Sequence, residues 1–274
     1  MVLTCRDLSV AYGHHEALRD FGMSVAKGEI RALIGPNGSG KSTALQTVAG
    51  LIQPARGTVN LGDDPLHTLT RRALAKRLAF LPQQPFAPDE MTVEQLVRQG
   101  RFCHVGLFRG YGAHDEEVIG WAIESTGLGH LAHRGIRELS GGERQRAWMA
   151  ASLAQEAAIL VLDEPTSFLD IGYQIEVLEL VHRLSRERAV TVVMAIHDIN
   201  QAMTIADRIS VLQSGRLVFD GDPHELGETD LIQDVFRVKG RFVDLAENRP
   251  RHFDIELARS TGQTHREGTA SERR

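Results

Sequence analysis

The stretch GPNGSGKST at positions 35–43 restricts the fold more than any other feature of this chain. It fits the pattern G-x-x-x-x-G-K-S/T through Gly35, Gly40, Lys41 and Ser42. The apolar run EIRALI comes directly before it, as expected of a strand, and the run KSTALQTVAGLI continues with the period of a helix. A glycine-rich loop between a strand and a helix predicts an α/β fold with a binding site at the carboxyl edge of the sheet.

Glycines in this pattern predict a loop that closes around phosphate groups. They let backbone N–H groups converge on phosphate oxygens, and the helix N-terminus adds roughly half a positive charge. The Lys41 ammonium would reach the β and γ phosphates and the Ser42 hydroxyl would bind Mg²⁺. The pattern alone does not separate a kinase from a GTPase or a transporter subunit, and a glycine turn that binds nothing is the alternative. The predicted nucleotide-binding residues are Gly35, Pro36, Asn37, Gly38, Ser39, Gly40, Lys41, Ser42 and Thr43.

Two adjacent carboxylates follow a fully apolar run. AAILVLD at 157–163 has the composition of a buried parallel strand, and Asp163 and Glu164 stand at its carboxyl end. Adjacent strand residues point to opposite faces, so both can serve one site only if the strand ends there, as Pro165 indicates. Asp163 is then a Mg²⁺ ligand and Glu164 the base that polarises an attacking water, unless the pair is a solvated acidic turn.

A histidine follows another predicted strand at the same edge. AVTVVMAI at 189–196 is apolar, and His197 comes directly after it. On its own such a histidine is more often structural, with Asp198 a cap for a helix at 199–206. Beside the phosphate loop and the two carboxylates, His197 becomes a candidate catalytic residue.

The predicted elements are those of an α/β sheet interrupted by helices. Between about 85 and 156 the strand-like runs are missing, which indicates an inserted helical lobe. Residues 258–274 are polar and predict a disordered tail, and 225–257 gives no firm prediction. The remaining predicted elements are strands at 29–34 and 77–82, helices at 41–52 and 175–187, and a hairpin at 209–221 that turns at Ser214–Gly215.

Charge and hydropathy exclude several classes of function. The net charge of −5 gives no global basic field for nucleic acid. Runs such as AAILVL are far shorter than the ~20 residues that a membrane-spanning helix needs, and the N-terminus lacks the pattern of a signal peptide. The two cysteines, Cys5 and Cys103, form no metal-binding or disulfide pattern. We therefore expect a cytosolic chain whose connection to a membrane comes through a partner.

Taken together, these motifs resemble those of ATP-binding subunits of ABC transporters, over about residues 2–225. The Walker A and Walker B stretches are GPNGSGKST and ILVLDE, and LSGGERQ at 139–145 is similar to the family signature. Gln83 in FLPQQ lies where the family has its Q-loop glutamine, with Gln84 as the neighbouring alternative. The remaining matches are His197 (the switch histidine), Tyr12 in LSVAYG (the aromatic residue that stacks on adenine) and Asp170 in SFLD (the D-loop), where Phe168 replaces the usual alanine.

The resemblance implies a P-loop NTPase fold, in which a RecA-like lobe with an antiparallel strand layer carries the inserted helical lobe. It also implies that two copies of the chain pair head to tail, with ATP and Mg²⁺ between the Walker A loop of one copy and the signature of the other. The limits that follow are about 1–84 and 157–225 for the RecA-like lobe, about 85–156 for the helical lobe, and about 226–257 for a C-terminal appendage.

Roles for individual residues follow from the same resemblance. It implies that Glu164, His197 and Gln83 form the catalytic group, and that Gln83 joins Ser42 and Asp163 around Mg²⁺. Gln83 and the helical lobe would transmit the nucleotide state to membrane permease subunits. The chain would then lie peripherally on the cytoplasmic face of the inner membrane. A periplasmic or surface substrate-binding protein would be an indirect partner, because the chain itself does not touch the transported substrate.

The start of the signature helix supports two interpretations. Ser140 and Glu143 fit S-x-x-E, the pattern of a capping box at a helix N-terminus. The resemblance implies that Ser140, Gly141 and Gly142, with Glu143 and Asp170 nearby, also form the wall that meets the nucleotide held by the second copy. Because one hydroxyl oxygen cannot fully serve both partners, the two roles compete at Ser140.

Further stretches indicate the transported class. MTVEQLVRQGRF, LDIGYQIEVLELVHRLSRE and HDINQAMTIAD resemble importers of iron–siderophore complexes, haem and cobalamin, and most of all hydroxamate siderophore importers. A haem or cobalamin importer is one alternative, and an exporter subunit is another. DNA-repair ATPases need a long coiled-coil insertion, but only 57 positions separate Gln83 from Ser140. Translation factors of this type usually carry two Walker A loops, whereas this chain has one.

Overall fold

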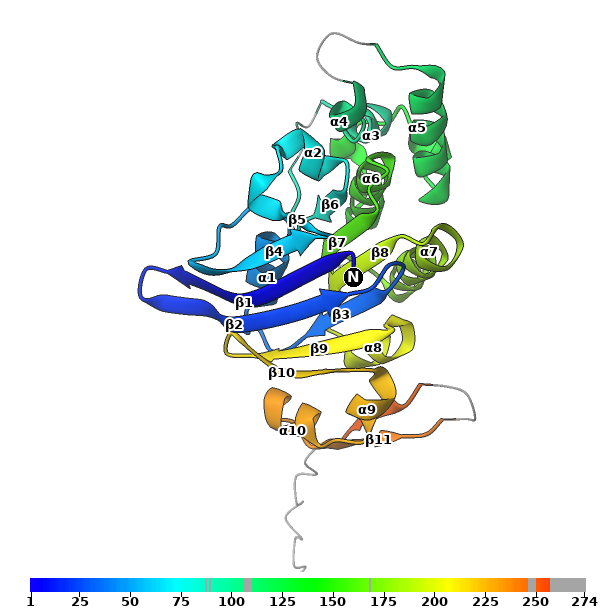
Figure 1. Cartoon of the computed structure of the whole chain (residues 1–274). Helices are drawn as coiled ribbons and strands as arrows, with labels where there is room; N and C mark the ends of the chain where they lie inside the picture. The colour runs from blue at the N-terminus through cyan, green and yellow to red at the C-terminus, as the bar shows by residue number, and fades with distance from the viewer. Residues whose placement is uncertain (87, 89, 106–109, 168, 246–249, 257–274) are drawn as a thin grey trace, which may run out of the picture.

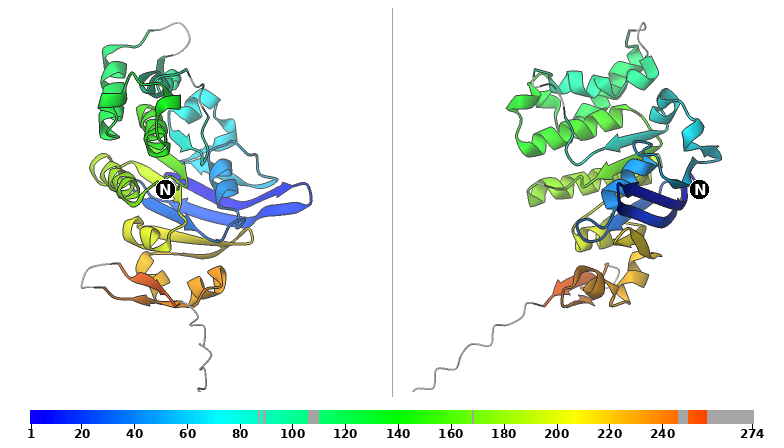
Figure 2. Two further views of the ribbon diagram at one scale, coloured as in Figure 1. Left: turned by 180° about the vertical axis from the view of Figure 1, so that it is seen from behind. Right: turned by 90° about the vertical axis from the view of Figure 1, so that its left-hand side faces the viewer.

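The computed structural model describes residues 1–86, 88, 90–105, 110–167, 169–245 and 250–256. Phe168 of the D-loop and the tail predicted at 258–274 lie outside these residues. Figures 1 and 2 show a central body of two sheets, with a group of helices at one end and a small C-terminal unit at the other.

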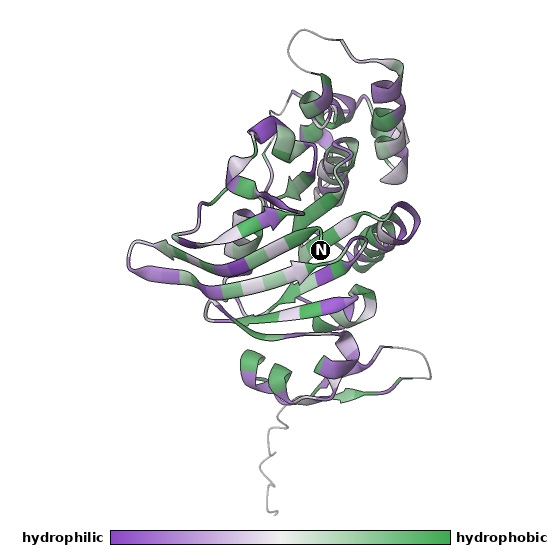
Figure 3. Ribbon diagram, in the orientation of Figure 1, coloured by the Kyte–Doolittle hydropathy of each residue, from purple (hydrophilic) through white to green (hydrophobic). Residues whose placement is uncertain are grey.

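The main sheet is predominantly parallel, as the alternation of strands and helices predicts. In the described part of the chain it has six strands, and β10 at one edge pairs antiparallel with its neighbour. The inner strands are predominantly apolar because both faces are covered, with exceptions such as the buried Arg31, and Figure 3 shows their mostly hydrophobic colour. In spatial order the strands are β10 (Arg216–Gly221), β9 (Arg208–Gln213), β3 (Ile30–Ile34), β8 (Thr191–Ala195), β7 (Ile159–Asp163) and β6 (Leu78–Leu81).

A second, antiparallel sheet covers one face of the main sheet. Helix α1 (Lys41–Val48) follows the phosphate loop and packs in the core that the two sheets share. Every second residue of the main strands points into this core, among them Leu33, Val161 and Val193. The strands of the second sheet are, in spatial order, β2 (His15–Val25), β1 (Leu3–Tyr12), β4 (Arg56–Leu61) and β5 (Asp64–Pro65).

Helices cover the other face. α7 (Ile171–Arg188) buries Val177, Val181 and Leu184 against the sheet, and α8 (Ile199–Ile205) lies beside it. The same core continues without a break into the group of helices between β6 and β7. That group comprises α3 (Val93–Gln99), α4 (Phe102–Val105), α5 (Ala113–Ser125), α6 (Gly141–Ala154) and the short helices η2 (Gly129–Leu131) and η3 (Ile136–Glu138).

A buried arginine holds this helical group together. Arg101 is 2% exposed and donates to Asp115 (2.9 Å), to the Ala154 carbonyl (3.0 Å) and to Glu156 (2.5 Å). It thereby ties the ends of α3, α5 and α6. A buried guanidinium is stable only with such partners, because an unpaired buried charge costs several kcal/mol.

The C-terminal residues, for which sequence patterns make no firm prediction, fold into four short elements. They pack against the edge of the main sheet at β9 and β10 and against α8 (Figure 1). We call this unit the appendage. Its elements are α9 (Pro223–Gly227), α10 (Leu231–Phe236), β11 (Gly240–Val243) and β12 (His252–Ile255).

The predicted end of the first helix is wrong. The helix expected at 41–52 ends at Val48, so Ile52 lies outside it. Gly50 has a φ of 71°, the left-handed conformation that commonly terminates helices. The chain then runs through β4 and β5 to η1 (Leu66–Thr68) and α2 (Arg71–Ala75).

Candidate active site

The loop at 35–43 has the conformation that a phosphate cradle requires. Gly35 has a φ of 152°, and a Cβ there would lie 2.2 Å from the Leu212 carbonyl oxygen. Gly40, with a φ of 104°, would place a Cβ 2.6 Å from the Ala17 carbonyl oxygen. Any side chain at either position would push the loop off β9 or β2. The loop is therefore closely supported from behind, with the N-terminus of α1 at its end.

Two buried polar side chains mark where an anion fits in this loop. Lys41 is 5% exposed, and its Nζ donates to the carbonyls of Gly35 (2.7 Å) and Pro36 (3.1 Å). Burial lowers the pKa of Lys41, and the nearby Glu164 and Asp163 oppose this shift. The buried Ser39 Oγ has no hydrogen-bond partner within the described residues. Phosphate oxygens would satisfy these donors, so the loop fits the nucleotide that the sequence predicts.

Asp163 ends β7 and meets the start of α1. The Ser42 hydroxyl donates to Asp163 Oδ1 at 3.1 Å, although 121 positions separate them. Burial raises the pKa of Asp163. A hydroxyl and a carboxylate side by side suit Mg²⁺, which takes one or two protein oxygens and completes its shell with phosphate and water. The described residues contain no group of three or more His, Cys, Asp or Glu that could hold a metal.

Glu164 lies in the same site because β7 ends just before it. Its φ of 55° turns the backbone sharply, so that neighbouring carboxylates that would diverge in a strand both face the loop. The Gln83 amide donates to Glu164 Oε2, and His197 Nε2 contacts Glu164 Oε1. The Glu164 side chain is 8% exposed and that of His197 is 43% exposed. Of the two neighbouring glutamines, Gln83 is the one that reaches the carboxylate.

Ser167 is a site residue that the sequence reasoning missed. Its hydroxyl donates to Glu164 Oε2 at 3.1 Å, and its backbone N–H donates to the Glu164 carbonyl at 3.1 Å. Pro165 directly after Glu164 is typical of the second position of a turn, and that signal could have placed Ser167 back over the carboxylate. Glu164 thus contacts three side chains, which come from the segments after β6 and β8 and from its own turn.

The signature residues are not part of this cluster within one chain. Ser140 Oγ accepts from Glu143 N–H (3.3 Å) and Glu143 Oε2 accepts from Ser140 N–H (2.7 Å), which confirms the predicted capping box. The hydrogen bond from Ser140 N–H lowers the pKa of Glu143. Ser140 and Gly141 are exposed, and in the described part of the chain no hydrogen bond links 140–143 to 35–43.

The remaining predicted residues are Asp170, Gly142 and Tyr12. Asp170 is the N-cap of α7 and accepts from Tyr173 N–H at 3.1 Å. Gly142 packs beside α7, since a Cβ there would lie 3.4 Å from the Tyr173 ring. Tyr12 is 51% exposed at the end of β1, in the hairpin whose second strand passes behind the phosphate loop.

Known proteins are similar to this chain in sequence. The family model described as ABC transporter matches residues 18–167. The iron(3+)-hydroxamate import ATP-binding protein FhuC of Bacillus subtilis is 39% identical, over 94% of this chain and 96% of that protein. The ferric enterobactin transport ATP-binding protein FepC of Escherichia coli is also 39% identical, over 86% of this chain and 88% of that protein.

Two solved structures agree with these relatives. A putative metal-chelate type ABC transporter in an inward-facing conformation gives a TM-score of 0.81 at 28% identity, covering 93% of this chain and 98% of that one. A dimeric bacterial ABC transporter cassette gives 0.72 at 27% identity, covering 80% and 98%. The chain belongs to the ABC transporter family and carries that family's ATPase domain.

Proposed function

We propose that this chain is the ATP-hydrolysing subunit of a membrane importer for ferric siderophores. The observation that carries the hydrolytic part is the convergence of Gln83, His197 and Ser167 on Glu164, next to the Ser42–Asp163 pair. The names of the relatives support the transported class. In this proposal the RecA-like lobe is about 1–84 and 157–225, the helical lobe about 85–156 and the appendage about 226–257.

The residues divide the chemistry among them. The loop 35–43 binds the phosphates through backbone N–H groups and Lys41, and Tyr12 stacks on the adenine. Glu164 accepts the proton of the attacking water, and Gln83 and His197 hold its carboxylate in place. Ser42 and Asp163, with Gln83 nearby, would hold Mg²⁺. When bound, the ion would neutralise part of the phosphate charge.

A second copy of the chain completes the site in this proposal. The start of α6 makes no hydrogen bond to the phosphate loop of its own chain among the described residues, although a helix N-terminus attracts anions. A head-to-tail pair brings Ser140, Gly141 and Gly142 of one copy onto the γ-phosphate held by the other, with Asp170 beside them. The dimeric cassette that this chain resembles supports such a pairing.

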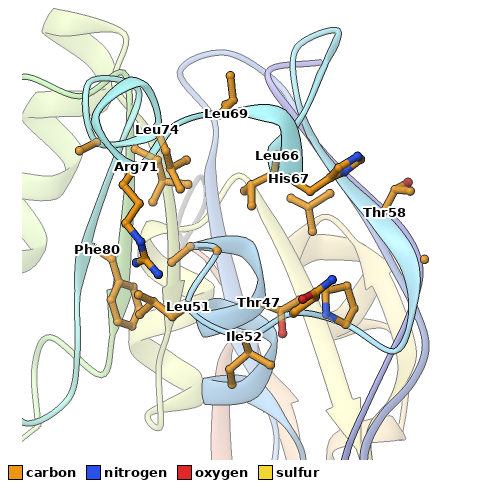
Figure 4. Close-up of a pocket in the computed structure, with 18 of the residues that line it drawn as sticks. Thr47, Leu51, Ile52, Thr58, Leu66, His67, Leu69, Arg71, Leu74 and Phe80 are labelled. Atoms are coloured by element: carbon orange, nitrogen blue, oxygen red, sulfur yellow. The ribbon is translucent and has the colours of Figure 1, made fainter.

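No helix in the described residues is long and apolar enough to cross a bilayer. We propose that permease subunits hold the chain at the cytoplasmic face of the inner membrane. They would dock in a hollow of about 690 Å³ between the end of α1, β4, α2 and β6, shown in Figure 4. Leu51, 58% exposed, lies at this hollow, and Phe80 of β6 lines it three positions before Gln83. The short segment from Phe80 to Gln83 therefore connects this hollow to the Glu164 carboxylate.

Leu51→Glu tests this docking surface. A buried charge at an apolar interface costs several kcal/mol, so we expect uptake by cells carrying the variant to fall at least tenfold. The ATPase rate of the isolated subunit should stay within about twofold, because the hydrogen bonds and ion pair that join the described site residues do not involve Leu51. Val218→Glu, at an exposed aliphatic position on β10, is the matched control and should leave uptake unchanged. Normal uptake with Leu51→Glu would place the permease elsewhere.

Deletion of the gene tests the transported class. We expect loss of uptake of a radiolabelled ferric hydroxamate, with restoration by the intact chain but not by a Lys41→Ala variant. Uptake of haem and of cobalamin should remain intact. If haem or cobalamin uptake is lost and ferric hydroxamate uptake is kept, the chain serves that other substrate and the ferric siderophore assignment is wrong.

A further inference from the structure

The appendage is bonded to the helix that follows the switch histidine. Asn200, three positions after His197, stands in the first turn of α8. Its Oδ1 accepts from Phe253 N–H of β12 at 2.7 Å, and its Nδ2 donates to the Phe253 carbonyl at 3.3 Å. Its Nδ2 also lies 3.3 Å from His252 Nε2. The side-chain amide therefore pairs with both backbone groups of one residue, as a neighbouring strand would.

The appendage side of this contact is firmly anchored. Phe253 is 3% exposed, and its ring meets that of Phe242 edge-on with 5.1 Å between centroids. Arg251 donates to the Gly227 carbonyl at 2.9 Å, which ties β12 to α9. Asn200 is thus hydrogen-bonded to a packed hairpin. The hairpin therefore fixes the position of the Asn200 side chain.

The other side of the contact ends at the active site. β8 ends at Ala195 and α8 begins at Ile199, so His197 lies in a three-residue connection between two fixed elements. Asp198 caps α8 by accepting from the N–H groups of Asn200 (2.8 Å) and Gln201 (3.1 Å). A shift of the first turn of α8 must therefore move the backbone that carries His197, which contacts Glu164.

We propose that Asn200 is a positioning residue for hydrolysis, through which the appendage holds the switch histidine against Glu164. The appendage lies beyond the span of the family match, which ends at 167. The proposal gives this unit a role in catalysis. The proposal rests on the proposed function, because it concerns the same hydrolytic site. It predicts an effect on turnover and none on nucleotide binding, since neither Asn200 nor β12 contacts the phosphate loop or the signature through a hydrogen bond among the described residues.

Asn200→Ala in the full chain is the first test. We expect kcat for ATP to fall about tenfold, because a misplacement near 1 Å can cost up to about 10²-fold in rate. KM for ATP and ATP-driven dimerisation should be unchanged. Asn200→Asp keeps the acceptor for Phe253 N–H and should recover part of kcat. Thr204→Ala is the control: it removes a hydrogen bond from Thr204 Oγ1 to the Asn200 carbonyl (2.7 Å) but keeps the Asn200 side-chain amide, so it should behave as the unaltered chain.

A double substitution separates positioning from a general structural effect. In a His197→Ala background, Asn200→Ala should change the single-turnover rate by less than twofold, because the group it positions is gone. Phe253→Ala, which unseats the hairpin, should lower kcat like Asn200→Ala, and the two should not add. An unchanged kcat in Asn200→Ala, or an undiminished tenfold loss in the His197→Ala background, would overturn the proposal. If the unaltered chain does not hydrolyse ATP at all, the proposed function fails instead.

Discussion

The Glu164→Gln variant is expected to bind ATP with normal affinity and to hydrolyse it about 10²–10⁴ times more slowly than the unaltered chain. Glutamine keeps the size of the side chain and can still accept from Gln83, but it cannot take a proton from water. ATP bound between two copies should therefore persist, and the variant should elute as a dimer from a sizing column run with ATP and Mg²⁺. Steady-state phosphate release and elution volume are the two measurements.

A second acidic position serves as the control for Glu164. Glu179 is exposed on α7, the helix that follows the site, and Glu179→Gln should hydrolyse ATP at the normal rate. The unaltered chain should elute as a monomer once its ATP has been consumed. Near-normal turnover by Glu164→Gln would show that another group accepts the proton, and the role given to Glu164 would be withdrawn.

Ser140→Ala should lose ATP-driven dimerisation and, with it, most ATP turnover. A hydrogen bond to a charged group contributes about 1.5–3 kcal/mol, so the rate should fall roughly 10–100-fold. The same change removes a helix cap and costs about 1 kcal/mol of stability. ATP binding to the single subunit should remain, because the phosphate loop is untouched. Sedimentation in the Glu164→Gln background, where the dimer lasts, measures the loss directly.

Two further variants distinguish the cap from the phosphate contact. Glycine at an N-cap costs only a few tenths of a kcal/mol relative to serine, so Ser140→Gly should lose the dimer while keeping the helix. Thr92 and Gln95 form the same kind of capping box on α3, away from the proposed nucleotide contact. Thr92→Ala should therefore lose similar stability and still dimerise. If Thr92→Ala also lost the dimer, the cap would be the larger role of Ser140.

Sequence reasoning located the parts of the site whose residues are neighbours in the chain. The loop 35–43 and the pair Asp163–Glu164 carry their geometry in local patterns, glycines before a helix and carboxylates after an apolar strand. The contact between Gln83 and Glu164 spans 81 positions, and only the resemblance suggested that these residues belong together. Ser167 was missed because a hydroxyl folded back over its own turn has no periodic signal.

The elements of the appendage could not be predicted from sequence patterns. Its helices and strands are four to six residues long, shorter than the window over which a period of two or 3.6 can be recognised. Its position is set by contacts between residues far apart in the chain, such as Asn200 with Phe253, which are separated by 53 positions. The early end of α1 had a local signal in Gly50, but glycine in a helical pattern does not by itself mark a terminus.

The strand order of the main sheet has a consequence for how the chain is made. β3, which leads into the phosphate loop, lies between β8 and β9, and its Ile30 bonds through its N–H to Asp207, 177 positions later. At about 5–20 residues per second, a ribosome would need roughly 9–35 s to synthesise that interval. During this time an apolar strand with both edges unpaired is exposed. We therefore expect expression of this ATPase to depend more on protection by a chaperone during synthesis than on the stability of the finished protein.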